Sequence, residues 1–174
     1  MLVSFSGLPA TGKTTLARAV AVRLPAVHLR IDTIEQASVD AGADAHPVGP
    51  IGYYVARALA ADHLRQGLAV VADCVNPLPV TRDMWRDVAQ RAGVTLVEVE
   101  VLCSDRRLHQ QRVRDRRSDI PGLPLPTWQE LAQISYAPWD RDRLTIDTAD
   151  LALDEAVDAI LVAATSPPAH RDLA

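Results

Sequence analysis

This chain of 174 residues has a single lysine, two cysteines and no long uninterrupted apolar stretch. No apolar run approaches the roughly 18 residues that a membrane-spanning helix needs. Cys74 and Cys103 each lie at the end of an apolar run, where a free thiol usually behaves as a small core side chain, so no disulfide framework is indicated. The start of the chain shows no basic segment with a cleavage site. We therefore expect a soluble, cytoplasmic protein with no membrane partner.

The charge balance is slightly acidic. Asp and Glu number 22 against 18 for Lys and Arg, a formal net charge of −4, which offers no general attraction for nucleic acid. The five histidines are scattered, with no paired spacing and no cysteine at ligand spacing, so no zinc site is indicated. A length of 174 residues predicts about one domain with a sizeable core.

The one lysine, Lys13, lies in a complete Gly-x4-Gly-Lys-Ser/Thr motif that spans residues 7–14, and all 17 other basic residues are arginine. The apolar residues 2–6 before the motif predict a buried strand, and residues 15–22 after it predict a helix. This strand, loop and helix order is the setting that a phosphate-binding loop requires. The alternative is a glycine-rich turn that merely joins a strand to a helix.

The residue types of the motif suit ATP and Mg²⁺. Gly7 and Gly12 let successive N–H groups point at phosphate oxygens, and the helix N-terminus adds its positive end. Lys13 would bridge the β- and γ-phosphates, Thr14 would bind the magnesium ion, and Thr15 would donate to the α-phosphate. The predicted ATP contacts in this loop are Gly7, Leu8, Pro9, Ala10, Thr11, Gly12, Lys13, Thr14 and Thr15.

Apolar strand-like runs alternate with helix-like segments, which predicts an α/β fold with a parallel sheet covered on both faces. The expected strands are residues 2–6, 27–31, 68–72, 94–102 and 144–146. The expected helices are residues 13–24, 33–39, 51–66, 80–92, 104–116, 127–136 and 153–164. A loop over 41–50 and a frayed tail are also expected.

Two kinds of nucleotide-using protein are excluded by what is missing. Cys74 follows the Walker B-like run 68–73, where a motor or transporter ATPase would usually place a water-activating glutamate. The guanine-recognition motif Asn-Lys-x-Asp is impossible, because the only lysine is in the loop. A small phosphotransferase remains, and such an enzyme needs a closing lid to keep water from the γ-phosphate.

A cluster of six arginines within residues 106–117 predicts that lid. Arg112 and Arg116 lie four positions apart, on one helix face, and could neutralise charge on the transferred phosphoryl group. The alternative is a solvated basic face paired with Asp105, Asp115 and Asp119.

Taken together, the sequence resembles small P-loop kinases of the group that includes gluconate kinase, chloramphenicol phosphotransferase, the polynucleotide 5′-kinase domain and zeta toxins, many of them known only as AAA domain proteins. The matching segments are residues 7–15, 30–32, 71–73, the Arg112/Arg116 pair and 146–148. The resemblance implies a three-layer P-loop fold, with a five-stranded parallel sheet in the order 2-3-1-4-5 and an arginine-bearing lid. We expect one kinase domain over residues 1–164, a lid at about 104–126 and a flexible tail over 165–174.

The resemblance also assigns roles around the acceptor. Asp32 matches the acidic residue that ends the second strand and faces the acceptor hydroxyl, so it is the candidate general base. Its alternative role is the N-cap of residues 33–39. Asp73 matches the carboxylate that lies near magnesium or the acceptor. The further predicted acceptor contacts are Tyr53, Arg57, Asn76 and Arg82, with an ordinary turn as the alternative for Asn76.

On the nucleotide side, the resemblance places Asp147 and Thr148 beside the adenine, with Arg112 or Arg116 on its other face. Trp128, Tyr136 and Trp139 could line an acceptor pocket, although aromatic residues at this spacing are more often core.

The sequence therefore predicts transfer of the ATP γ-phosphate to a hydroxyl of a sugar, nucleoside, nucleotide or drug-like compound, by a monomer or homodimer. The alternatives are a polynucleotide 5′-hydroxyl kinase and a non-catalytic ATP-binding regulator. Glu35 stands where a polynucleotide kinase tends to show an arginine, and the histidine-centred signature of gluconate kinase is not evident. Both departures argue against those two named activities.

Overall fold

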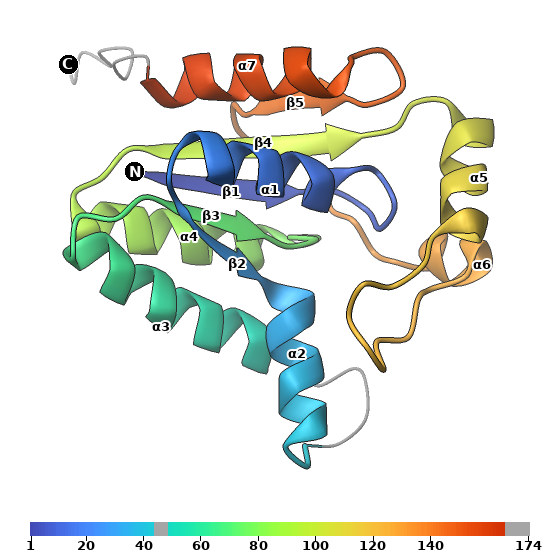
Figure 1. Ribbon diagram of the computed structural model, residues 1–174, viewed down its shortest axis with the longest axis horizontal. Coiled ribbons are helices and arrows are strands. Elements are labelled where there is room, and N and C mark those ends of the chain that lie inside the picture. Colours follow the sequence, from blue (N-terminus) through green and yellow to red (C-terminus); the bar gives the residue numbers. More distant parts are fainter. Residues whose placement is uncertain (44–48, 166–174) are drawn as a thin grey trace.

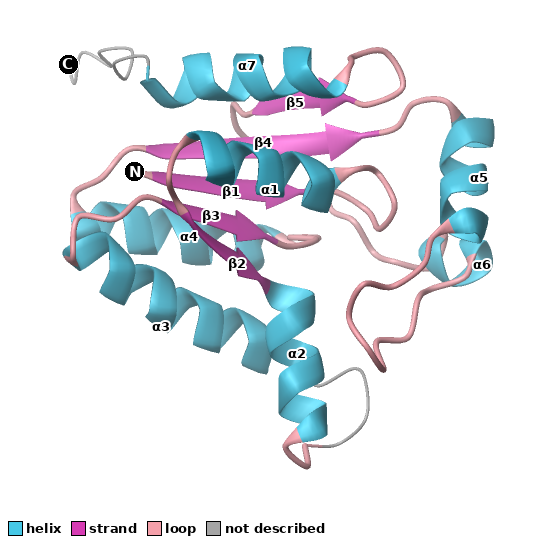
Figure 2. Ribbon diagram, in the orientation of Figure 1, coloured by secondary structure: helices cyan, strands magenta, loops and turns pink. Residues whose placement is uncertain are grey.

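The computed structural model describes residues 1–43 and 49–165, and within them a parallel five-stranded sheet lies between two layers of helices (Figures 1 and 2). The strands pair in the order β2-β3-β1-β4-β5, which confirms the predicted order. The strands are β1 (Leu2–Ser6), β2 (Val27–Arg30), β3 (Val70–Asp73), β4 (Leu96–Leu102) and β5 (Leu144–Asp147). The helices are α1 (Lys13–Arg23), α2 (Ile31–Asp40), α3 (Ile51–Arg65), α4 (Pro79–Ala92), α5 (Arg106–Asp115), α6 (Trp128–Leu131) and α7 (Leu153–Thr165).

The central strands β1 and β3 are buried along their whole length, as expected for strands covered on both faces. Successive side chains of β1 point to opposite faces of the sheet. Val3 and Phe5 join the core under α1 and α7, whereas Leu2 joins the core under α3 and α4. The sheet is therefore covered by one hydrophobic core on each face. Because all of its strands are parallel, their carboxyl ends lie at the same edge.

The region predicted as the lid lies beside that carboxyl edge. In Figure 1, α5, α6 and the loop between them form a separate arm next to the ends of the strands. Asp105 caps α5 by accepting from the backbone N–H groups of Arg107 and Leu108, at 2.8 and 3.1 Å. Thr127 and Glu130 form a reciprocal capping box on α6, so each short helix has its own start signal.

Some boundaries differ from the sequence predictions. The helix α2 begins at Ile31 directly after β2, so Asp32 lies in its first turn. Neither the strand-end position nor the N-cap role predicted for Asp32 is correct, and Arg30 is the N-cap residue. The helix expected over 127–136 is a single turn, because the capping box starts it and turns follow Leu131. Part of the predicted 41–50 loop and residues 166–174 of the predicted tail lie outside the described residues.

Within residues 1–43 and 49–165, no helix is long and apolar enough to cross a membrane.

Candidate active site

A cleft of about 880 Å³ opens at the carboxyl edge of the sheet, where ligands bind in open parallel sheets. Its walls come from the loop after β1, the start of α1, the ends of β2 and β3, the arm around α5, and the segment after β5. Segments far apart in the sequence therefore meet around one space, which is large enough for a ligand of drug size or more.

The loop before α1 has the conformation that its glycines permit. Gly7 and Gly12 have φ angles of 135° and 100°, a region that L side chains rarely adopt. A Cβ on Gly7 would collide with the carbonyl oxygen of Val101, and one on Gly12 would lie 3.3 Å from the Thr148 side chain. The two glycines thus allow the loop to turn against β4 and the segment after β5.

The N-terminus of α1 is open for an anion. No side chain caps it, and its first turn contains no acidic residue. Lys13 is the first residue of α1 and is 7% exposed, with Nζ donating to the Leu8 carbonyl oxygen at 2.8 Å. Burial lowers the pKa of Lys13, which Asp73 and Asp32 partly oppose. Uncapped N–H groups and a buried ammonium at one point make an anion-binding site.

A carboxylate stands beside this site at the end of β3. Asp73 is 3% exposed, and its Oδ2 lies 3.4 Å from Nε2 of His28 and has no hydrogen-bond partner of good geometry among the described residues. Burial raises the pKa of Asp73, but the nearby His28 and Thr14 side chains and the charge of Lys13 outweigh burial and lower the pKa, which favours the ionised carboxylate. An ionised, incompletely satisfied oxygen next to the Thr14 hydroxyl suits a water of a hydrated Mg²⁺ ion.

No group of three or more His, Cys, Asp and Glu side chains that could hold a metal alone occurs in the described part of the chain. A metal here would therefore depend on oxygens from a bound phosphate and from water, as Mg²⁺ usually does.

The opposite wall of the cleft carries a cluster of charges. Asp32, in the first turn of α2, lines it and lies 3.4 Å from the guanidinium of the buried Arg30. Asp119, from the loop between α5 and α6, accepts from Nη1 of Arg30 at 2.8 Å and also pairs with Arg18 of α1. Hydrogen bonds from Arg18 and Arg30 hold the pKa of Asp119 well below its usual range. This carboxylate ties the lid loop to both sides of the cleft.

Glu35 also lines the cleft, and sequence reasoning assigned it no role. It is half-buried, and burial together with the charge of Asp32 raises its pKa to about 7. The missed signal is its position three residues after Asp32, which puts both carboxylates on one face of α2.

The two predicted lid arginines have different surroundings. Arg112 donates from Nη1 to the Thr148 hydroxyl at 2.7 Å and from Nη2 to the Thr148 carbonyl at 3.1 Å. The Thr148 hydroxyl in turn donates to the carbonyl of Thr11 in the phosphate-binding loop at 2.8 Å. Arg116 is the C-cap residue that follows α5. It lines the cleft, and its charge lowers the pKa of Lys13. Arg116 is therefore outside the helix, and the expectation of one helix face bearing both arginines is wrong.

A second contact from α5 to the loop was not anticipated. Nε2 of His109 lies 2.8 Å from the carbonyl oxygen of Pro9, and the His109 ring packs edge-on against Trp128 of α6. Asp147, predicted beside the adenine, instead accepts from the backbone N–H groups of Ser104 and Ala149, each at 3.0 Å, and does not line the cleft. Its side chain thus links the segment before α5, which leads to Arg112, to the segment after β5, which contains Thr148.

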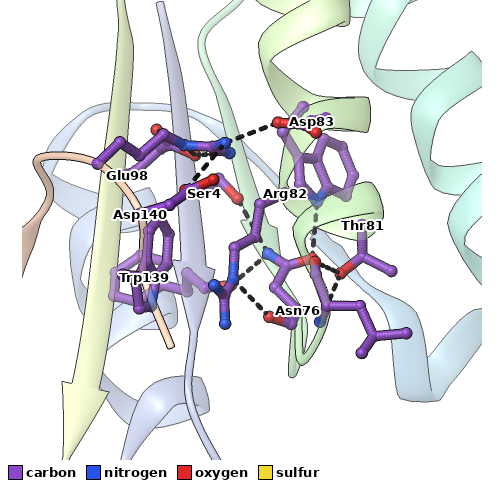
Figure 3. Close-up of polar contacts among 12 residues, drawn as sticks. Ser4, Asn76, Thr81, Arg82, Asp83, Glu98, Trp139 and Asp140 are labelled. Atoms are coloured by element: carbon purple, nitrogen blue, oxygen red, sulfur yellow. Dashed lines mark hydrogen bonds and ion pairs between the residues drawn. The ribbon is translucent and has the colours of Figure 1, made fainter. Parts of the chain in front are cut away.

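Three predicted acceptor contacts belong to the interior. Asn76 is fully buried, donates to Ser4 Oγ and to the Phe5 carbonyl at 3.1 and 2.9 Å, and accepts from the Trp85 indole at 3.1 Å (Figure 3). The Tyr53 hydroxyl accepts from the Asn76 backbone N–H at 3.0 Å. Because these groups already have partners away from the cleft, the structure does not bring Asn76 and Tyr53 to its wall, and their substrate contacts stay a prediction.

Arg82 is 1% exposed and donates to four backbone carbonyls, those of Asn76, Pro77, Ala137 and Pro138. Its guanidinium lies 4.2 Å from the centroid of the Trp139 ring and 5.1 Å from that of Tyr136, and Figure 3 shows it beside Trp139. Arg82 therefore fastens the segment after α6 to α4 and does not line the cleft, so its acceptor contact stays a prediction. Tyr136 and Trp139 are half-buried around its guanidinium, and neither lines the cleft.

Arg57 lies on the outer side of the helical layer. It pairs with Asp87 of α4 at 3.2 Å and lines a separate groove between α3 and α4, so the structure does not bring it to the cleft and its acceptor contact stays a prediction.

Comparisons with known proteins agree with this architecture. Residues 2–133 match the family model described as AAA domain. A curated protein of Aeropyrum pernix, described as a probable adenylyl-sulfate kinase, is 23% identical over 174 residues, covering 90% of this chain and 88% of the relative.

Two solved structures extend the comparison. The APS kinase CysC of Mycobacterium tuberculosis, in complex with AMPPNP and APS, superposes with a TM-score of 0.66 at 18% identity, over 92% of this chain and 94% of that one. A gluconokinase from Sinorhizobium meliloti gives a TM-score of 0.61 at 18% identity, over 93% and 92%. At these identities the likeness shows the shared fold, which is that of the P-loop kinases.

Proposed function

Because this chain belongs to the AAA domain family and has the fold of the P-loop kinases, we propose that it transfers the γ-phosphoryl group of ATP to a hydroxyl of a small molecule. One observation carries the proposal. The phosphate-binding loop and the carboxylates of Asp32 and Asp73 line the same cleft, with Arg116 beside Lys13. Positioning and charge neutralisation are what phosphoryl transfer chiefly requires.

In this proposal ATP binds with its phosphates on the loop of residues 7–15. The N–H groups at the start of α1 and the ammonium of Lys13 hold the β- and γ-phosphates. The hydroxyl of Thr14 would hold Mg²⁺, and Asp73 would hold a water of that ion. When bound, Mg²⁺ neutralises charge that develops on the phosphate oxygens.

The acceptor binds on the wall that carries Asp32. Its hydroxyl oxygen forms the new bond to the γ-phosphorus, while the bond from the γ-phosphorus to the bridging oxygen of ADP breaks. Asp32 receives the hydroxyl proton. Arg116 stabilises the charge on the transferring phosphoryl group from the lid side. The arm around α5 and α6 excludes water, so that ATP is not simply hydrolysed.

The test is a coupled ADP-release assay over sugars, nucleosides, nucleotides and hydroxylated antibiotics, followed by mass spectrometry of any product. We expect one compound class to raise ADP release well above the basal rate and to gain one phosphoryl group. Lys13→Ala should abolish turnover, because the variant lacks the ammonium between the β- and γ-phosphates.

The same assay separates the two alternatives. A polynucleotide 5′-hydroxyl kinase would respond to oligonucleotides with a free 5′-hydroxyl and to no small compound. A regulator without transfer activity would bind ATP·Mg and release ADP no faster with any hydroxyl compound. Either pattern would overturn the proposed activity.

A further inference from the structure

Glu35 is a carboxylate that lines the cleft. Among the residues that the structure describes, no hydrogen bond or ion pair to its side chain is found, although it is half-buried. A half-buried charge without a partner is costly. The raised pKa of Glu35 has the same origin, since burial and the neighbouring Asp32 both disfavour its ionised form.

The chain makes room for this side chain. Gly52, in the first turns of α3, lies against Glu35, and a Cβ at position 52 would come within 2.6 Å of Glu35 Cγ and 2.9 Å of Oε1. Glycine inside a helix costs about 0.5–1 kcal/mol relative to alanine. Here it allows α3 to pack beside α2 while Glu35 keeps its place at the wall of the cleft.

The charges on this wall do not balance. Arg30 and Arg18 are its cations, and both are held by Asp119 from the lid loop. Asp32 shares Arg30 at the longer distance of 3.4 Å, and Asp73 lies 4.0 Å from Arg30 Nε. The other cations that line the cleft lie on the phosphate-binding loop, on α5 or on the loop directly after α5. Glu35 and, in part, Asp32 are left as excess negative charge.

We propose that the acceptor carries a protonated amino or guanidino group beside its reactive hydroxyl, and that Glu35 binds this cation. The inference rests on the proposed function, because it names the substrate class of the same site. Residues three apart on a helix have Cβ atoms about 5–6 Å apart. A ligand that places its hydroxyl at Asp32 and its cation at Glu35 therefore carries the two groups within a few bonds, as in amino alcohols, amino sugars and aminocyclitols.

Such a ligand restores the missing partner. An ammonium in contact with Glu35 would favour the ionised carboxylate and form charge-assisted hydrogen bonds with it. An anionic acceptor would instead meet two carboxylates on one face of α2, and like charges at that spacing repel.

The first experiment compares matched acceptors that differ in charge. ADP release is measured with glucosamine, N-acetylglucosamine, glucose and gluconate, and with a panel of amino alcohols and aminocyclitols beside their deaminated forms. We expect stimulation only by compounds with a free amino or guanidino group. Glu35→Gln should raise KM for such an acceptor by roughly 10- to 100-fold with kcat nearly kept, which is a loss of ground-state binding.

Asp40→Asn is the matched control. It removes the same single charge from the same helix, at its far end, where Asp40 accepts from Gln36 and does not line the cleft. We expect the control to keep the KM of the parent. A second variant, Gly52→Ala, keeps the carboxylate but displaces it, and should raise KM for cationic acceptors in the same direction.

A second measurement does not depend on turnover. The chain contains five glutamates, so [5-¹³C]glutamate labelling gives five side-chain carboxyl signals, and Glu35→Gln assigns one of them. With AMPPNP·Mg bound, addition of glucosamine or an aminocyclitol should lower the pKa of the Glu35 carboxyl, while glucose should not.

Transfer to neutral or anionic compounds alone would overturn this inference and leave the proposed function standing. The same holds if AMPPNP·Mg binds but no cationic compound either stimulates turnover or moves the Glu35 signal. Failure of ATP·Mg to bind would instead overturn the proposed function itself.

Discussion

At the scale of single residues, Asp32 separates transfer from hydrolysis. Asp32→Asn should keep ATP affinity, because the phosphate-binding loop is untouched, while acceptor phosphorylation falls by roughly 10²–10⁴-fold. Basal hydrolysis needs only a water near the γ-phosphate and should fall far less. Both rates can be measured in one assay, with and without acceptor. Near-parental phosphorylation by the variant would remove Asp32 from the role of base.

Arg112 and Arg116 should differ in the step that they affect. Arg112 is already bound to Thr148, so Arg112→Ala should loosen the wall around the nucleotide and raise KM for ATP. Arg116 faces Lys13, so Arg116→Ala should lower kcat by roughly 10²-fold or more, as expected for an arginine on the transferred phosphoryl group. Steady-state kinetics of both variants tests the split. Equal losses of kcat would show that both act on the phosphoryl group.

Glu35 should also set a pH dependence of stability. Its pKa is raised in the folded chain to about 7 from an ordinary value of 4.5, so the folded state holds this proton through a pH range in which the unfolded state has lost it. The free energy of unfolding should therefore fall as pH rises from about 4.5 to about 7. Glu35→Gln carries no titrating group and should lack this component. Urea unfolding of parent and variant at pH 5 and pH 8 measures the difference, and a pH-independent difference would contradict the raised pKa.

At the scale of elements, Asn76 joins β1, β3 and α4. Its φ of 47° lies in the left-handed region, which asparagine tolerates better than most residues. Asn76→Ala would leave the Trp85 indole without its hydrogen-bond partner in the interior and would remove the donors to Ser4 Oγ and the Phe5 carbonyl. We expect a loss on the order of 2–4 kcal/mol in the free energy of unfolding. Urea unfolding followed by tryptophan fluorescence measures it, and a loss below about 1 kcal/mol would show that water replaces the amide.

The elements were predictable because their signals are local. Strands such as residues 2–6 are recognisable as apolar runs between turn signals. The strand order is implied by the resemblance to P-loop kinases, and the structure confirms it. The roles of Asn76 and Arg82 were not predictable. A polar residue after a strand has the same sequence signature whether it points into the cleft or into the interior. Two of the four carbonyl partners of Arg82, in 137–138, lie more than 50 residues away along the chain.

The lid shows the same limit. An arginine-rich segment after β4 predicts an arm, but it does not predict which carboxylate of that arm binds to the rest of the protein. From the sequence, Asp119 is expected to pair only with neighbouring arginines. The structure pairs it with Arg18 and Arg30, both about 90 residues or more away along the chain. Such pairings depend on tertiary geometry, which no local pattern encodes.

At the scale of the whole molecule, nucleotide binding should stabilise the fold. The cleft joins segments from the loop after β1 to the segment after β5, so a bound nucleotide would hold most of the chain together. A ligand at 100 times its dissociation constant adds about 2.7 kcal/mol to the free energy of unfolding. Thermal unfolding with AMPPNP·Mg should show this gain for the parent and not for Lys13→Ala. An equal gain in both would place the nucleotide elsewhere.

The single lysine gives the protein an unusual chemical property. Apart from the amino terminus, Lys13 offers the only primary amine in the chain, and it lies 7% exposed at the bottom of the cleft. Amine-reactive reagents therefore have one internal target, and their attachment would report directly on occupancy of the loop. An acylating reagent should modify the terminus of the folded protein at once and Lys13 slowly, with ATP·Mg as a protectant. For the same reason, coupling the protein to a surface through its amines should leave it oriented by its terminus and still able to bind nucleotide.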